Sequence, residues 1–351
     1  MKTNISPKLY DLLQTAVKQN ASDLFLVPGE PPALRLNGLI ERTDANPLSA
    51  EEIEGIAAAA LGSDEIKRIG AEVGQIHRAI RVSGMPSMRL CVARATGCYT
   101  IVANIMMSGI YSVEELAIPK AMIQATMARW GLIVFSGLAG SGKSTSAYAL
   151  VDYINSQNAC HISTIEDPIS VEIPSKKAIV QQRELGVDVP DIASGVHAAM
   201  GQDLDVLFIN EVYSAEDLQA CLAPAETGHL VITVLHSAAS PEETIRRMID
   251  VFPEEARDVS RRTLANVLRG VSAQRLLPHV KGGRVAAYGV LIPDDEMRTA
   301  IAQGRDFMKR ETPFPDGCQT IAEEVEKFRR DGIVSEETAQ RALSAFWSGR
   351  L

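Results

Sequence analysis

The chain has 351 residues, of which 46% are hydrophobic and 23% are charged, and its formal net charge is −9. This length predicts about two domains, each able to bury a core without disulfides or a structural metal. The composition excludes a disordered chain and a coiled-coil rod, and no apolar run reaches the ~18 residues that span a bilayer. Acidic residues outnumber basic ones, 44 to 35, so we expect no nucleic-acid partner. The N-terminal segment lacks the apolar core of a signal peptide, and we therefore expect a cytoplasmic protein without a direct membrane span.

The segment up to residue 108 predicts a small α+β domain with a largely antiparallel sheet. One helix is expected to begin near Ile5 and another after Ser49, which has the capping-box spacing to Glu52. Asn37 and Gly38 predict a hairpin turn. Apolar runs predict strands over residues 23–27, 33–36, 75–82, 88–93 and 99–105.

The remainder of the chain has a different character. Residues 109–118 are expected to form a linker, with a short helix signal from Ser112 to Glu115. From residue 119 to 351, strands alternate with helices, which is typical of a parallel sheet with right-handed crossovers. Two charged helices are expected to end the chain. The strands are predicted over residues 133–135, 161–166, 206–209 and 230–235. The predicted fold class is α/β, with the parallel-sheet domain preceded by the smaller α+β domain.

The strongest motif runs from Gly137 to Ser144, and it fits the P-loop pattern G-x-x-x-x-G-K-[ST] between a strand and a helix. Glycines let backbone N–H groups curl around a phosphate, and the helix adds the positive end of its dipole. Lys143 is expected to reach the β- and γ-phosphates of ATP, and the Ser144 hydroxyl is expected to ligate Mg²⁺. The predicted nucleotide-binding residues are Gly137, Gly140, Ser141, Gly142, Lys143, Ser144 and Thr145.

Two acidic residues stand at the ends of predicted strands. Glu166, followed by Asp167 and Pro168, ends one strand, and Glu211 ends another. The carboxyl edge of an open α/β sheet is where ligands bind. One such carboxylate is expected to support Mg²⁺ through water, together with Ser144, and Glu211 is the candidate. Glu166 is a candidate for orienting the attacking water; the alternative for both residues is a solvated loop acid.

Two histidines flank the predicted strand at 230–235. His229 precedes it and His236 follows it, seven residues apart. We expect them at the two ends of the strand and not in one metal site. His236 falls at the carboxyl end, where it is a candidate sensor of the γ-phosphate; a structural role is the alternative for each.

These motifs together resemble the secretion ATPases of type II secretion and type IV pilus systems. The segments GLAGSGKST, TIEDPI, INEV and AETGHLVITVLH follow one another in the order of that family, and the chain is most similar to its twitching-motility retraction branch, PilT and PilU. The sequences ASDL at residues 21–24, QRE at 182–184, VFP at 251–253 and CQT at 318–320 add to the likeness. The tetracysteine zinc insert of assembly ATPases is missing, which favours retraction over extension.

The resemblance implies a PAS-like N-terminal domain, a RecA-like ATPase domain and a homohexamer. The alternative assembly is a ring mixed with a paralogous ATPase. It implies that ATP hydrolysis drives domain rotation, that Glu166 polarises the attacking water, and that Glu211 supports Mg²⁺. His229 and His236 correspond to the family's histidine box. The implied task is pilus retraction, with the protein held at the inner membrane by a platform protein.

Three arginines of the family pattern are missing near the expected phosphates. Tyr213 and Gly201 stand at two of these positions, and the third lies in the stretch 96–104, which has no arginine. Arginines that approach the γ-phosphate contribute about 10³–10⁵ in rate. The alternatives are therefore a weakly hydrolysing accessory subunit of a pilus motor, or a related secretion or conjugation ATPase. The arginines that remain as candidates are Arg89, Arg94, Arg183, Arg246 and Arg247.

Overall fold

The computed structural model describes residues 5–36, 38–80, 82, 84–105, 109–236 and 240–348, with backbone only for 345–348. The chain divides into two compact units. The first comprises Met1–Gly109 together with Pro168–Glu172, and the second comprises Ile110–Asp167 and Ile173–Leu351. Residues 106–108, where we expected the first domain to end, lie outside the described part, as does Asn37 of the predicted hairpin turn.

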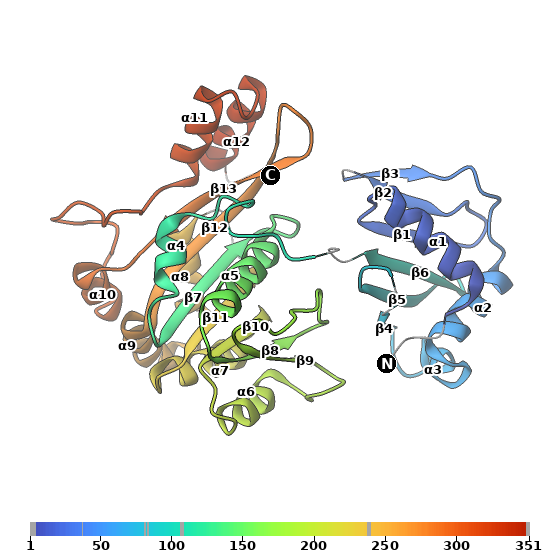
Figure 1. Ribbon diagram of the computed structural model, residues 1–351, viewed down its shortest axis with the longest axis horizontal. Coiled ribbons are helices and arrows are strands. Elements are labelled where there is room, and N and C mark those ends of the chain that lie inside the picture. Colours follow the sequence, from blue (N-terminus) through green and yellow to red (C-terminus); the bar gives the residue numbers. More distant parts are fainter. Residues whose placement is uncertain are drawn as a thin grey trace. The chain divides into compact units, whose positions relative to one another are not determined.

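The first unit is an α+β domain whose sheet is antiparallel at every described pairing (Figure 1). The strand order is β3-β2-β1-β6-β5-β4. The strands are β1 (Asp23–Leu26), β2 (Ala33–Leu36), β3 (Leu39–Arg42), β4 (Gln75–Ile80), β5 (Met88–Ala95) and β6 (Cys98–Ile105). The helices are α1 (Pro7–Lys18), α2 (Ala50–Leu61) and α3 (Ser63–Arg68). The predicted antiparallel sheet is confirmed.

Local sequence signals start the helices of this unit. The Ser6 hydroxyl accepts from the backbone N–H of Leu9 at the start of α1. The capping box predicted at the start of α2 is present, with Ser49 and Glu52 bonded reciprocally. Leucine and isoleucine side chains from α1, α2 and the sheet then pack into one buried core. A side-chain cap thus sets where α1 and α2 begin, and burial of their apolar faces stabilises them.

The second unit contains a seven-stranded sheet, counted over the described residues, in the order β13-β12-β7-β11-β10-β8-β9 (Figure 1). All neighbouring pairs are parallel except β12 with β13. The strands are β7 (Gly131–Gly137), β8 (His161–Glu166), β9 (Ile179–Glu184), β10 (Val206–Val212), β11 (Leu230–His236), β12 (Leu268–Pro278) and β13 (Arg284–Leu291). The predicted parallel sheet is therefore confirmed, and the fold class is α/β.

Helices connect the strands and extend the chain beyond the sheet. In chain order they are α4 (Lys120–Ala125), α5 (Lys143–Gln157), α6 (Ile192–Met200), α7 (Ala215–Glu226), α8 (Pro241–Asp250), α9 (Arg257–Val267), α10 (Asp295–Ala302), α11 (Ile321–Arg330) and α12 (Glu336–Ser348). The last two are the charged helices expected at the C-terminus. The segment from Ser112 to Glu115 forms a bonded turn and no helix, so that signal was wrong. None of the helices in the described part is long and apolar enough to cross a membrane.

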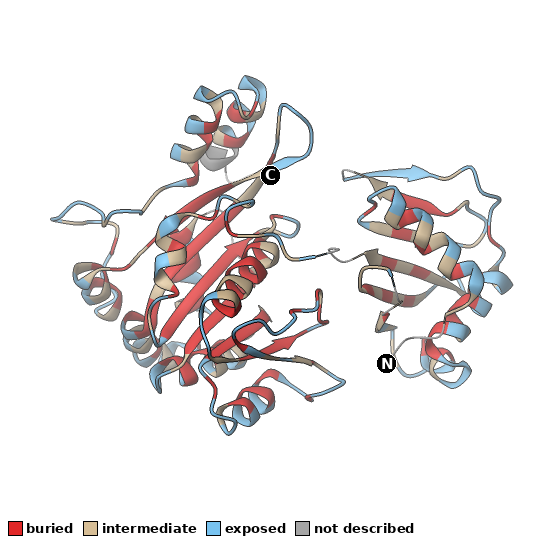
Figure 2. Cartoon of the chain, in the orientation of Figure 1, coloured by how far each residue is buried: buried red, intermediate tan, exposed pale blue. Residues whose placement is uncertain are grey.

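The central strands of the second unit are buried along their length (Figure 2). Every residue of β7 is buried, which explains its continuous apolar sequence. The parallel register aligns His236 of β11 with Gly137 of β7, and Asn210 of β10 with Glu166 of β8. The carboxyl ends of four strands therefore meet at one edge of the sheet, where the P-loop begins.

Candidate functional site

The P-loop leaves the end of β7 and turns into helix α5 within a few residues. Gly140 and Gly142 adopt positive φ angles of 74° and 85°, a region that glycine enters without steric cost. A Cβ at Gly137 would lie 2.5 Å from Ser141 Oγ, and one at Gly142 would lie 2.8 Å from Gln274 Nε2. A Cβ at Gly140 would meet nothing within 4 Å. The loop is thus packed against the protein at two glycines and open at the third.

Ser141 lies inside this loop with an unsatisfied hydroxyl. Its Oγ atom is buried and has no hydrogen-bond partner among the described residues. A buried polar atom without a partner costs free energy unless a ligand or water satisfies it. Together with the backbone turn, this atom fits a phosphate group held by the loop.

Lys143, the first residue of α5, is only 4% exposed and points to Glu211 on β10. Its Nζ lies 3.1 Å from Glu211 Oε1. The Ser144 hydroxyl donates to the same oxygen at 3.4 Å. The structure therefore brings together the predicted phosphate-binding lysine and both predicted metal-supporting residues.

The second oxygen of Glu211 has two further partners. His236 Nε2, at the end of β11, lies 2.5 Å from Oε2, and the Tyr213 hydroxyl donates to the same oxygen at 2.8 Å. The rings of Tyr213 and His236 are stacked, with centroids 5.9 Å apart. We call Lys143, Ser144, Glu211, Tyr213 and His236 the Glu211 cluster. Sequence reasoning noted Tyr213 only as the replacement of a family arginine and missed its contact with Glu211.

The electrostatics of the cluster favour an ionised Glu211. Burial acts to raise the pKa of this carboxyl, but the charge of Lys143, the Tyr213 hydrogen bond and the charge of His236 outweigh it. The net effect lowers the pKa of Glu211 below its ordinary value of 4.5. A charged, oxygen-donating carboxylate beside a serine hydroxyl is the kind of ligand pair that Mg²⁺ prefers.

Glu166 occupies a different position from the one expected for a residue that faces a nucleotide. It ends β8, and its side chain is fully buried, with 0% exposure. Thr164 Oγ1 and Gln182 Nε2 donate to Oε1 at 2.5 and 2.9 Å, and the Tyr148 hydroxyl donates to Oε2. The alternative of a solvated loop acid is therefore excluded for Glu166, whereas the neighbouring Asp167 is exposed.

The two histidines lie at opposite ends of β11, as predicted. Six residues, Leu230 to Leu235, lie between them, and seven steps of about 3.3 Å along an extended strand place them about 20 Å apart. His229 Nδ1 contacts the carbonyl oxygen of Pro224 at 3.1 Å and Thr227 Oγ1 at 3.3 Å. The structure thus places His236 in the Glu211 cluster and His229 at the other edge of the sheet, and a catalytic role for His229 stays a prediction. The described residues contain no group of three or more potential metal ligands from His, Cys, Asp and Glu.

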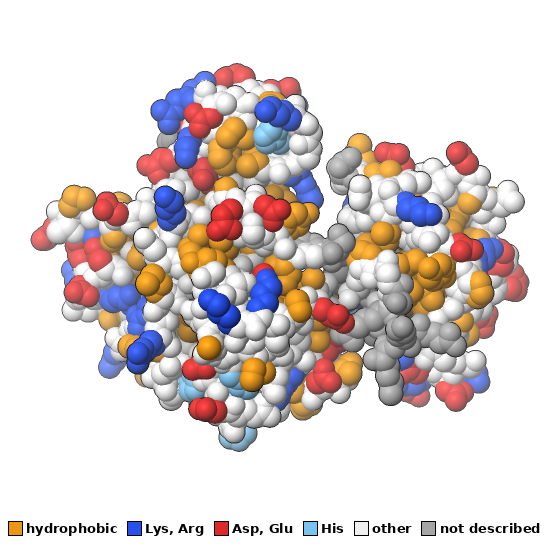
Figure 3. Space-filling model, in the orientation of Figure 1, with side chains coloured by type: hydrophobic (Ala, Val, Ile, Leu, Met, Phe, Trp, Pro, Cys, Tyr) orange, Lys and Arg blue, Asp and Glu red, His pale blue; other side chains and the backbone are white. Residues whose placement is uncertain are grey.

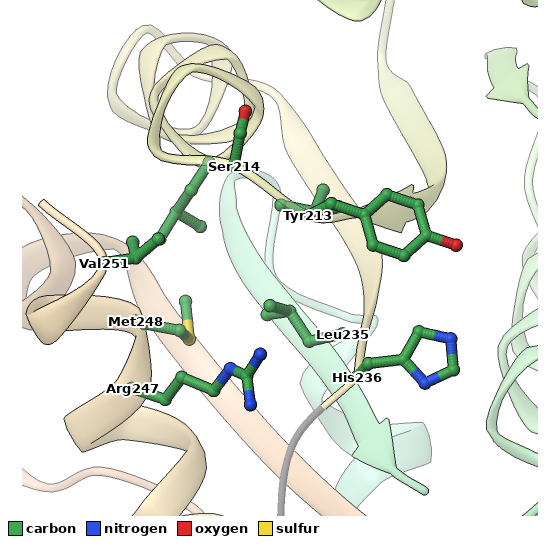
Figure 4. A pocket seen from close by; sticks show the side chains of 9 residues that line it. Tyr213, Ser214, Leu235, His236, Arg247, Met248 and Val251 are labelled. Atoms are coloured by element: carbon green, nitrogen blue, oxygen red, sulfur yellow. The ribbon is translucent and has the colours of Figure 1, made fainter. Parts of the chain in front are cut away.

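A small hollow of about 60 Å³ opens beside the Glu211 cluster (Figure 4). Tyr213 and His236 line one part of it, and Arg247 and Met248 of α8 line another. The guanidinium group of Arg247 points into this hollow in Figure 4 and forms no ion pair within the described residues. The other arginine of this helix, Arg246, pairs with Glu242 and Asp306. Of the arginines named as candidates, Arg247 is the one that lines a hollow together with His236.

The face of the molecule shown in Figure 3 carries charges of both signs. On the face shown in Figure 3, acidic and basic side chains are interspersed, and no basic stripe runs across the described residues that are visible there. The absence of a nucleic-acid partner remains a prediction.

Comparisons with known proteins agree with this geometry. The chain matches the family model for type II/IV secretion system proteins over residues 2–341. It is 31% identical over 333 residues to the type IV pilus retraction ATPase PilT of Pseudomonas aeruginosa, covering 94% of this chain and 96% of that protein. It is 30% identical over 334 residues to the type IV pilus ATPase PilU of the same organism, covering 93% and 86%.

A crystal structure of the pilus retraction motor PilT with bound ADP has the same fold, with a TM-score of 0.82 at 33% identity over 95% of this chain and 96% of that one. The P-loop, the Glu211 cluster and these relatives lead to one conclusion. The chain is a P-loop ATPase that belongs to the family of type II/IV secretion system proteins.

Proposed function

We propose that this chain is a Mg²⁺-dependent ATPase that powers type IV pilus retraction as a homohexamer, with ATP hydrolysis coupled to domain rotation. The observation that carries the proposal is the Glu211 cluster, in which Lys143, Ser144 and His236 all contact one carboxylate beside the P-loop. The likeness to PilT and PilU over nearly the whole chain supports the pilus motor as its setting.

In this proposal the phosphates of the bound nucleotide replace Glu211 as the partner of Lys143. The loop residues Gly137, Gly140, Ser141 and Gly142 surround the β-phosphate, and Thr145 follows in α5. Lys143 would pair with phosphate oxygens, and Glu211 and Ser144 would then hold Mg²⁺, Glu211 through water. Bound Mg²⁺ supplies charge neutralisation at the phosphates. His236, at the end of β11, senses the γ-phosphate through its contact with Glu211.

The remaining parts of the proposal concern partners and location. A first domain of the PAS type spans residues 1–108, a linker spans 109–118, and the ATPase domain spans 119–351. The protein acts in the cytoplasm and reaches the inner membrane through a platform protein. Family resemblance supports these statements.

Steady-state ATP turnover tests the enzymatic part. We expect turnover with Mg²⁺ that is lost with EDTA and falls at least 100-fold in Glu166→Gln, because removal of a general base costs about 10²–10⁴. The matched control is Glu172→Gln, which changes an exposed glutamate six residues further along. Turnover that survives Glu166→Gln contradicts the assigned role of Glu166.

A second candidate function is an accessory subunit that binds ATP and hydrolyses it slowly. Two observations favour it: Tyr213 replaces the family arginine, and Glu166 is fully buried. This function predicts binding of ADP without turnover by the chain alone, and turnover that appears only in a ring mixed with a paralogous ATPase.

A further inference from the structure

Tyr148 lies on the P-loop helix, five residues after Lys143, and its side chain is buried with a defined orientation. Its ring meets Phe208 of β10 edge to face, with ring centroids 5.2 Å apart at 73°. Both rings are at most 1% exposed. Such a pair fixes the direction of the tyrosine hydroxyl through packing. That hydroxyl donates to Oε2 of Glu166, one strand beyond the Glu211 cluster.

The other oxygen of Glu166 is held by side chains of the sheet. Thr164 Oγ1 and Gln182 Nε2 both donate to Oε1. The amide of Gln182 is itself oriented, because its Oε1 accepts from the backbone N–H of Ile173 at 2.7 Å. A backbone N–H can only donate, so the Gln182 nitrogen must face Glu166. Side chains from a helix and two strands therefore hold the carboxyl group of Glu166 in one orientation.

The proposed function requires Glu166 to polarise the attacking water, and in this arrangement Glu166 cannot reach water. A carboxylate that polarises water must reach that water within hydrogen-bond distance. In the structure, Glu166 has no exposed surface, and donors of its own chain hold both of its oxygens. Its carboxylate must therefore leave this buried position, and at least one of these donors, before it can contact water.

We propose that Tyr148 is a positioning residue that holds Glu166 away from water, and that release of Oε2 from the Tyr148 hydroxyl limits ATP hydrolysis. This inference rests on the proposed function of Glu166. The proton of the attacking water passes to the released carboxylate, and Tyr148 neither gains nor loses a proton. The P-loop and Lys143 bind nucleotide whether or not the hydroxyl is released.

Tyr148→Phe tests the inference, because it removes only the hydroxyl and keeps the ring beside Phe208. We expect kcat/KM for ATP to rise about tenfold, since a hydrogen bond to a charged group is lost only from the withdrawn state. The affinity for ADP should be unchanged. The acidic limb of the pH profile of kcat/KM should move to higher pH, because the ionised carboxylate loses a donor. A purely structural tyrosine would not move this limb.

Two further variants make the test specific. Tyr153→Phe makes the same change on a half-buried tyrosine of the same helix and should leave kcat/KM unaltered. Thr164→Val removes the donor to Oε1 and should also raise kcat/KM, which keeps the test open if Tyr148→Phe does not fold.

The outcomes separate this inference from the proposed function. If the parent hydrolyses ATP and both donor variants hydrolyse it equally fast or more slowly, Tyr148 does not restrain Glu166. If the parent and both variants bind ADP but none hydrolyses ATP, the inference and the hydrolytic function both fail. If turnover appears only in Tyr148→Phe, the chain is an ATPase restrained by its own tyrosine.

Discussion

The Tyr213 hydroxyl donates to Oε2 of Glu211 at 2.8 Å. Tyr213 stands where the family pattern has an arginine, and it is 67% exposed. A tyrosine at this position orients the carboxylate and stacks on His236, but it brings no positive charge to the phosphates. Tyr213 thus holds Glu211 and His236 in place without adding a positive charge beside them.

Replacing Tyr213 by arginine should restore that charge. We expect Tyr213→Arg to raise kcat for ATP at least tenfold with little change in KM, because a guanidinium near the γ-phosphate acts mainly on the transition state. Tyr213→Phe is the control, since it keeps the stacking and adds no charge. Equal kcat values for the arginine variant and the parent would show that Arg247 or another cation already serves this purpose.

Loss of Lys143 should affect the fold as well as the nucleotide site. In Lys143→Ala, Glu211 keeps Tyr213 and His236 but loses the buried ammonium group of Lys143. We expect the free energy of unfolding to fall by about 1–3 kcal/mol without nucleotide, measured by denaturant titration. The double variant Lys143→Ala/Glu211→Gln should recover part of this loss, because no charge is then left unpaired. No recovery would mean that the ion pair contributes nothing to stability.

The ionised Glu211 also predicts a pH dependence of stability. Its pKa is lower in the folded protein than its ordinary value of 4.5. The resulting stabilisation is present above about pH 4.5 and is lost as the pH falls through the folded-state pKa. The melting temperature should therefore decrease more steeply below this pH in the parent than in Glu211→Gln. If the melting temperatures of the two proteins fall equally with pH, ionisation of Glu211 does not cause the loss of stability in acid.

One cysteine should be inert while the protein is folded. Cys221 of α7 is fully buried, and burial raises the pKa of its thiol to about 12. Because the thiolate is the reactive form, Cys221 should not react with a thiol reagent at pH 8 until the protein unfolds. Mass spectrometry of the Cys221 peptide measures this, with the half-buried Cys98 as the internal comparison. Fast labelling of Cys221 would show that α7 opens readily.

Much of the second unit was predictable because its local signals agree with its tertiary structure. The strand predicted over 161–166 coincides with β8, and Ser214 forms a capping box at the start of α7. Strand β9 was not predicted because four of its six residues are polar and only its last residue, Glu184, is buried. Strand β12 escaped because Ser272 and Gln274 interrupt its apolar run, although both are buried; Gln274 is satisfied by Ser146 of the distant helix α5.

The chemistry of the site was predictable only in part. Lys143 and Ser144 follow from a contiguous motif, and their meeting with Glu211 follows from the parallel sheet. The burial of Glu166 does not follow, because its donors Tyr148 and Gln182 come from a helix and a strand with no sequence motif that links them. Contacts between distant segments therefore decide whether the predicted base is accessible.

The most direct test of the account is the ATP turnover of Lys143→Ala, compared with the parent and with Lys177→Ala, which changes an exposed lysine. We predict turnover by the parent, a decrease of at least 100-fold in Lys143→Ala and no change in the control. Turnover by Lys143→Ala at the rate of the parent would contradict the claim that ATP is hydrolysed at the P-loop beside Glu211.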